Sequence, residues 1–386
     1  MAKKINLKPL REGIKKNKDG LKGISESLKP VKPRPEITNG TKSINIKRAL
    51  IKPDCSSKTV LTDSTWNYVD IFLRQQKTAK AKEALFYWEQ SKNFYQATTS
   101  LSLVSKPLTT YYCFLNATKA LLTYKEHNFN LKHGVSGKRI DNGRIKLQNE
   151  IISLKPKGVL SGLCEYLGKP VKADEPIYSL KDILYNLPFI HRAFQLTFDN
   201  KTNYGELYIP IQKSRFVYDK HRKKGWFEAE LEKEHSNKSI LSCLVGFGVD
   251  KKYTNQDYYV IRRNKTFKWD TYRNKPNKES LNSFENYYFN IRNKLRYIYS
   301  ANDLWYIKRT DLKNHIIDRN TVVLILAGMH RLSELSRYQP QTLEKHLESD
   351  HSWLLIEFIN KSLLQFIDNI SSEITGKDFR VTGFRT

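Results

Sequence analysis

The fold is decided by one apolar stretch, Pro107-Leu108-Thr109-Thr110-Tyr111-Tyr112-Cys113-Phe114-Leu115-Asn116-Ala117-Thr118-Lys119-Ala120-Leu121-Leu122. Its apolar side chains recur at helical spacing, which predicts a helix over residues 107–125. Ser105 and Pro107 are suited to an N-cap and an early helical proline. Residues 79–103 have the same periodicity and precede this helix after a short connection. The two segments therefore predict an antiparallel helical hairpin.

Three more helices are predicted toward the C-terminus, over residues 280–299, 321–337 and 352–372. In the first of them, apolar residues recur in steps of three and four, which is typical of an amphipathic helix. In the last, apolar residues surround the first two turns. We therefore expect this helix in the core, with Trp353 and Ile359 buried.

The middle of the chain changes to a period of two. Apolar and polar residues alternate over 207–212, and together with Phe194–Phe198 this predicts an antiparallel meander. Pro210 would confine its strand to a sheet edge, because proline cannot donate a ladder hydrogen bond. Residues 240–249 and 257–263 are further predicted strands.

These elements predict an α+β protein that is predominantly helical, with a helical hairpin base, a β-rich middle insert and C-terminal core helices. Four regions are expected. They are a basic extended arm over 1–62, a helical region with a polar loop over 63–193, a β-rich region over 194–275 and a C-terminal helical region over 276–386.

The predicted arm is strongly cationic. Residues 1–58 hold 16 Lys or Arg against 5 Asp or Glu, with no Phe, Trp or Tyr. Such a segment buries too little apolar area to fold alone. We expect it either to bind nucleic acid through its cations or to serve as a solubilising tail or a strap over the protein's own surface. Its deletion is expected to leave the melting temperature nearly unchanged.

Composition limits the function further. The chain has 386 residues and a formal net charge of +28, with 39% hydrophobic residues, enough for a core. No apolar run of membrane-spanning length and no signal-peptide core occur, so a cytoplasmic protein without membrane contact is expected. The four cysteines lie far apart, which disfavours a disulfide framework or a cysteine-rich zinc site. We expect no metal and no cofactor.

A polar loop around His133 carries the first candidate site. His133 and three cations could converge on an anion, with Gly134 and Gly137 allowing backbone N–H groups to approach a phosphate. The alternative is an ordinary surface loop whose glycines serve turns. The cations are Lys138, Arg139 and Arg144.

A second candidate is the pair Arg309 and His315, whose spacing matches that of some helical ribonucleases of bacterial defence. There a guanidinium would stabilise the phosphorane and an imidazole would move the proton. Chance alone explains this spacing, so His133 is the preferred catalytic candidate of the two histidines.

The third candidate is the basic and aromatic region 251–300, with 12 Lys or Arg against 4 Asp or Glu. Single-stranded nucleic acid is bound by such mixtures, in which cations follow phosphates and aromatic rings stack on bases. The alternative is a sheet whose aromatic residues face the core and whose charges face water. The candidate binding residues are Arg262, Arg263, Lys265, Lys268, Trp269, Arg273, Arg292 and Arg296.

Several landmarks, in this order, resemble the bacterial YaaC-like protein family over about residues 66–375. They are the helix 107–122, His133–Arg139, Ile145–Asn149, Tyr178–Pro188, Gly328–Arg331, Arg337–Pro340 and Ser349–Asp350. The resemblance implies an architecture and carries over no mechanism. Families of this kind are sometimes placed near restriction or anti-phage genes.

We therefore expect a basic nucleic-acid-binding protein, DNA or RNA, serving as a recognition subunit of a bacterial anti-phage defence or DNA/RNA-processing complex. One alternative is a metal-independent ribonuclease or another phosphodiester-cleaving effector. Another is a scaffold whose arm binds an acidic protein partner.

Overall fold

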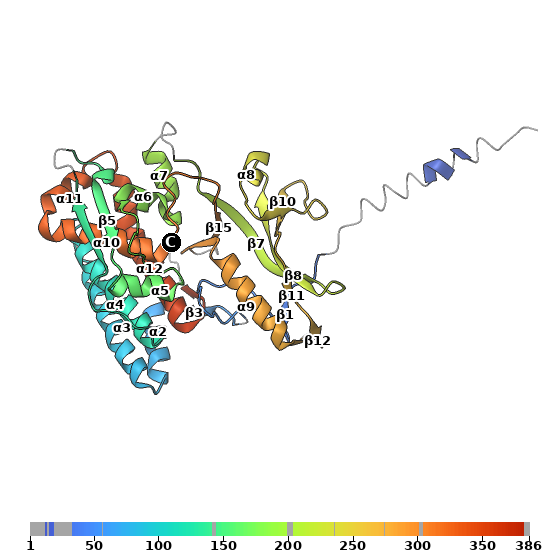
Figure 1. Cartoon of the computed structure of the whole chain (residues 1–386), viewed down its shortest axis with the longest axis horizontal. Coiled ribbons are helices and arrows are strands. Elements are labelled where there is room, and N and C mark those ends of the chain that lie inside the picture. The colour runs from blue at the N-terminus through green and yellow to red at the C-terminus, as the bar shows by residue number, and fades with distance from the viewer. Residues whose placement is uncertain are drawn as a thin grey trace, which may run out of the picture.

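The computed structural model describes residues 12–13, 15–18, 33–55, 57–140, 144–198, 204–234, 236–273, 275–300 and 304–381. Two hydrophobic cores lie side by side in it, a helical body and a sheet body (Figure 1). The predicted α+β class is confirmed.

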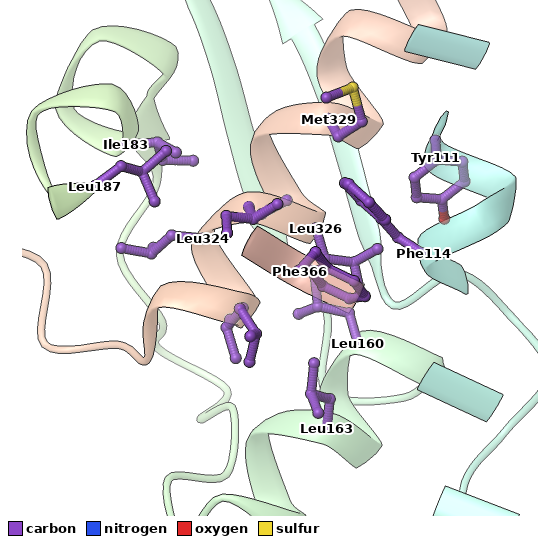
Figure 2. Packing of buried hydrophobic residues seen from close by; sticks show 14 of the residues in the cluster. Tyr111, Phe114, Leu160, Leu163, Ile183, Leu187, Leu324, Leu326, Met329 and Phe366 are labelled. Atoms are coloured by element: carbon purple, nitrogen blue, oxygen red, sulfur yellow. The ribbon is translucent and has the colours of Figure 1, made fainter. Parts of the chain in front are cut away.

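The helical body is built on the predicted hairpin. Helices α3 (Ala79–Thr98) and α4 (Lys106–Tyr124) form it, and α4 runs through the centre of this core. Phe114 of α4 stacks on Phe366 with ring centroids 4.1 Å apart, beside Leu326 (Figure 2). The other elements are α2 (Thr65–Gln75), α5 (Val159–Tyr166), α6 (Leu180–Tyr185), α7 (His191–Thr197), α10 (Thr321–Tyr338), α11 (Pro340–Leu347), α12 (Ser352–Thr375), and the sheet β4 (Val135–Arg139), β5 (Glu150–Leu154), β6 (Tyr178–Ser179).

The sheet body is a seven-stranded antiparallel sheet covered by α9 (Lys278–Arg292). Phe216 of the sheet contacts Phe284 and Tyr288 of α9, with ring centroids 5.1 and 6.1 Å away. The strands, in sheet order, are β14 (Leu295–Ile298), β15 (Leu304–Lys308), β7 (Tyr208–Asp219), β8 (Lys224–Glu232), β10 (Tyr258–Arg263) and β9 (Phe247–Val249), with β11 (Phe267–Lys268) beside β8. Helix α8 (Lys238–Ser242) and the hairpin β12 (Thr271–Tyr272), β13 (Lys275–Pro276) complete this body.

Several local predictions are wrong. The segment 240–249, predicted as a strand, begins in helix α8, which ends at Ser242, and only Phe247–Val249 form strand β9. Residues 194–197 belong to helix α7, and the helix predicted over 280–299 ends at Arg292, where strand β14 soon follows. Trp353 is 47% exposed, whereas Ile359 is buried as expected. Trp353 lies at the first turn of α12, where one side of the helix still faces solvent.

The strand that contains Pro210 is not an edge strand, since β7 lies between β15 and β8. Pro210 is paired with Tyr306 of β15, and the pairing of β7 with β8 begins only at Gln212. The proline therefore occupies a position with a neighbouring strand on one side, which satisfies the physical constraint in a different way.

Residues 33–55 and 57–62 of the predicted arm pack on both bodies, so the prediction of an extended arm is wrong there, and the alternative of a strap over the protein's own surface is the one that the structure shows. The N–H of Ile37 donates to Phe216 O at 2.8 Å, and Ile37, Ile44 and Ile46 are buried in the sheet core. Isoleucines replace the missing aromatic residues as the buried groups. The strands are β1 (Thr38–Asn39), β2 (Lys42–Ser43) and β3 (Val60–Thr62), the last paired in parallel with β16 (Phe379–Val381). The rest of the arm lies outside the described residues except for 12–13 and 15–18.

Candidate nucleic-acid interface

A cleft of about 820 Å³ lies where the N-terminal segment passes the sheet body. Residues 41–43, 45–47 and 57–59 form one wall, and residues 211–214 of β7 form the other, with Trp305 and Asp378 also in the lining. Four lysines line the cleft against a single carboxylate, that of Asp378. The lining therefore favours an anionic ligand.

One of these lysines, Lys47, is buried and held by a hydrogen bond, whereas the side chains of the other three are exposed. Lys47 is 3% exposed, and its Nζ donates to Ser57 O at 2.6 Å, so it joins the two stretches of the N-terminal wall. Lys42 and Lys58 are exposed. Within the described part of the chain, neither of these two ammonium groups has a carboxylate partner.

Lys213 enters the cleft from a β-bulge. The register of β7 against β8 shifts between Gln212 and Arg215, and Lys213 has a φ of 43°. Its Nζ is 3.0 Å from Glu230 Oε2, and the Lys213 side chain is 58% exposed. Bulges direct a side chain away from the sheet plane, and here the bulge places a cation opposite Lys42 and Lys58 across the cleft.

Trp305 contributes little ring surface to this cleft. Its indole is 7% exposed and contacts the guanidinium of Arg292 5.0 Å away. Phosphate contacts, rather than base stacking, are the chemistry that this lining offers.

The basic and aromatic region 251–300 is only partly on the surface. Trp269, Arg292 and Arg296 are buried at 2%, 6% and 7% exposure, so their prediction as binding residues is wrong. Trp269 packs in the aromatic core around Phe284, and the two arginines donate to backbone carbonyls. This outcome matches the alternative of aromatic residues facing the core.

The other cations of that region have different surroundings. Arg263 Nη1 donates to Gly246 O at 2.6 Å, and Lys268 pairs with Glu279 at 2.7 Å. The exposed members are Arg262, Lys265, Lys268 and Arg273. Arg262 and Lys268 lie on strands β10 and β11, Lys265 lies between these strands, and Arg273 follows β12. None of the four lines the lysine cleft.

The polar loop around His133 does not form a phosphate cradle. Lys138 and Arg139 lie on strand β4, and the Arg139 guanidinium is buried with Nε 3.4 Å from Glu150 Oε1. The N–H of Gly137 donates to Glu334 Oε1 at 3.2 Å. Only Lys138 and Arg144 of the three predicted cations are exposed.

The glycines of this loop serve close packing. A Cβ on Gly158 would lie 2.3 Å from the backbone of Gly134, and one on Gly137 would lie 2.4 Å from Arg331. Gly134 has a φ of 79° and Gly158 of 146°, which side chains rarely adopt. The loop is therefore locked against α10 and the start of α5.

His133 itself is exposed and rests on a buried polar pair. Its Nδ1 lies 2.5 Å from the Tyr111 hydroxyl, and the His330 ring is 5.7 Å away. Burial and the nearby cation Lys119 lower the pKa of His133, and burial raises the pKa of Tyr111. Tyr111 therefore keeps its proton, and the short contact is a hydrogen bond between the neutral hydroxyl and the His133 ring.

The pair Arg309 and His315 is not on a helix, and the two side chains have separate partners. Arg309 pairs with Asp311 at 2.6 Å, whereas His315 Nδ1 lies 2.8 Å from Asp182 Oδ1 and its ring stacks on Tyr204. Both residues lie in a loop, and their side chains do not form a common site.

The structure also contains a buried polar network beneath β4 that the sequence analysis did not predict. Glu150 is fully buried, and it accepts two hydrogen bonds from Arg331, while His346 Nε2 lies 3.0 Å from its other carboxylate oxygen. His346 Nδ1 lies 2.9 Å from His351 Nε2. These residues look like surface charges in sequence, so no periodicity could have identified them. Among the residues that the structure describes, no group of three His, Cys, Asp or Glu is placed to hold a metal ion.

The sequence analysis also did not predict that the lysines of the cleft lie together. Lys42 and Lys58 lie in the segment assigned to the arm, and Lys213 lies 155 to 171 residues further along the chain. The cationic composition of residues 1–58 was the available signal. Its spatial partner on β7 could not be inferred from sequence.

Comparison with known protein families gives a match over most of the chain. The model of a family described as YaaC-like Protein matches residues 53–374. No curated protein and no solved structure matches the chain. No helix within the described ranges has the length and apolar character needed to cross a membrane.

Proposed function

Since the chain belongs to the YaaC-like protein family over residues 53–374, we propose that this member binds nucleic acid, with the phosphate backbone held in the lysine cleft. One observation carries the proposal. Lys42, Lys58 and Lys213 line one cleft from two separate parts of the chain, where Asp378 is the carboxylate of the lining and Glu230 pairs with Lys213.

The overall charge supports the same ligand class. A net charge of +28 attracts polyanions over long range, and lysines that neutralise phosphates release counterions. Phosphate contacts from lysine are largely independent of base sequence. The expected binding is therefore salt-sensitive and weakly sequence-dependent.

The test is the affinity of the full chain for labelled single-stranded DNA, RNA and duplex DNA at low salt. The triple variant Lys42→Ala, Lys58→Ala, Lys213→Ala should bind at least about tenfold more weakly, since three ammonium groups no longer neutralise phosphates. The matched control replaces three exposed lysines near the start of α3, Lys77, Lys80 and Lys82, and should bind as the wild type does.

Two outcomes would overturn the proposal: no binding at low salt, or equal weakening in the two triple variants. The second outcome would assign binding to net charge rather than to the cleft. Binding of acidic proteins with no affinity for nucleic acid would favour the scaffold alternative. Degradation of RNA during the assay, abolished by His133→Ala, would favour the ribonuclease alternative.

A further inference from the structure

A small cavity lies at the junction of the two bodies, and its lining contains no carboxylate. The volume within which the centre of a water-sized sphere can lie is about 10 Å³. Three cationic side chains line it, Lys169, Arg296 and Arg319, together with the amides Asn293 and Asn320. The remaining lining is apolar apart from a thiol.

Arg296 differs from the other two cations in having no direct ion pair, although the Asp318 carboxylate acts on it at longer range. Lys169 pairs with Asp318, and Arg319 pairs with Glu175. Arg296 is 7% exposed, and its Nη1 donates to Asn293 O and Leu295 O at 2.7 and 2.9 Å. Within the described ranges no carboxylate lies at ion-pair distance from it, and its Nε and Nη2 have no hydrogen-bond partner.

Two further buried cations lie nearby, and Asp318, which acts on both Arg296 and Lys308, offsets part of the positive potential. Arg292 and Lys308 are also buried, at 6% and 7% exposure, and they too donate to carbonyl or amide oxygens. Helix α10 begins at the cavity, with Asn320 as its N-cap, and the free amides of a helix start carry partial positive charge. A buried cation is destabilising unless a counter-charge or polar groups compensate for its lost hydration.

We propose that this cavity binds one monatomic anion of the chloride type, held by the Nε and Nη2 donors of Arg296. Its size decides the ligand class, because a space that admits about one water leaves little room for a phosphate or sulfate. The site is separate from the lysine cleft and does not depend on nucleic-acid binding.

The bound anion would join the two bodies. Arg296 belongs to β14 of the sheet body, whereas Arg319 and Asn320 lead into α10 of the helical body. An ion that binds only the folded state stabilises it in proportion to the logarithm of its concentration above the dissociation constant.

The first experiment follows the melting temperature of the full chain as chloride replaces gluconate at constant ionic strength. The wild type should gain about 1–3 °C per tenfold rise in chloride. Arg296→Met should abolish this dependence. Arg263→Met is the matched control and should retain it, because that guanidinium contacts Gly246 outside the cavity. Equal dependence in all three proteins, or none in the wild type, would overturn the proposal.

The second experiment needs no variant and decides the question if Arg296→Met fails to fold. Crystals of the wild type grown in bromide should show an anomalous peak between Arg296 and the start of α10. Crystals with bromide elsewhere and only a water, or nothing, in this cavity would contradict the proposal.

Discussion

Arg48 of the N-terminal segment forms a buried ion pair with Asp368 of α12, with Nη1 2.7 Å from Oδ1 and the two side chains 2% and 3% exposed. This ion pair connects the N-terminal segment to α12, the last long helix of the chain. Arg292 and Glu373 hold the adjacent backbone. Arg292 donates to Lys47 O and Arg48 O, and Glu373 accepts from Leu50 N and Ile51 N.

Breaking this pair from one side should destabilise the protein strongly. Arg48→Met removes the guanidinium that pairs with the buried Asp368 carboxylate, and we expect a decrease of about 3–5 kcal/mol in the free energy of unfolding. Urea denaturation of the full chain measures it. Arg48→Met combined with Asp368→Leu should be less destabilising than the sum of the single variants, and an additive double variant would contradict this account.

The N-terminal segment should stabilise the sheet body through its isoleucines. Ile46→Ala is expected to cost roughly 2–5 kcal/mol as a large-to-small change in a core. Lys42→Ala, four residues earlier and exposed, should change stability by less than about 0.5 kcal/mol. Equal, small effects in both variants would show that residues 33–62 do not contribute to the core in solution.

The last helix should be sensitive on one face only. Ile359→Ala should cost roughly 2–5 kcal/mol, because Ile359 is 2% exposed. Trp353→Ala should cost clearly less, because the Trp353 side chain is 47% exposed. Thermal unfolding of both variants tests the register of α12, and the reverse order of effects would contradict it.

Mild acid should destabilise the helical body through its buried histidines. Burial lowers the pKa of His330 to about 3 and that of His351 to about 4, against 6.5 for the ordinary group. The unfolded chain therefore binds more protons than the native state between these values and pH 6.5. The contribution of each neutral histidine to the free energy of unfolding should be fully present above pH 6.5. It should decrease below pH 6.5, by roughly 2 kcal/mol per histidine at pH 5.

This pH dependence is measurable as the free energy of unfolding between pH 7.5 and 5. His330→Gln should reduce the slope, since it removes one group that protonates on unfolding. Carboxylates with lowered pKa, such as Glu150, cease to stabilise the native state only at lower pH, below their ordinary range. A slope unchanged in His330→Gln would show that this imidazole does not titrate as described.

Periodicity predicted the long helices well because their cores are apolar on a 3.6-residue repeat. Helices α3, α4, α10 and α12 were all found near their expected bounds. Phe194 was misassigned because a short helix and a short strand share the same apolar pattern.

The buried arginines could not be predicted. Arg292 and Arg296 are spaced four residues apart off the apolar stripe, which in sequence indicates a solvated face. Arg292 is satisfied by the carbonyl of Lys47, 245 residues away in the chain. The lysine cleft could not be predicted for the same reason, because it depends on residues that are distant in the sequence. Only the path of the N-terminal segment in the folded chain brings Lys42 and Lys58 opposite Lys213.

The most direct test of phosphate binding in the cleft is the salt dependence of affinity, measured as the slope of log affinity against log salt for duplex DNA. The wild type should show a steep negative slope. The Lys42→Ala, Lys58→Ala, Lys213→Ala variant should show one shallower by about 2–3, close to 0.9 for each phosphate that is no longer neutralised. The Lys77, Lys80 and Lys82 control should keep the wild-type slope. An identical slope in all three proteins would contradict the account.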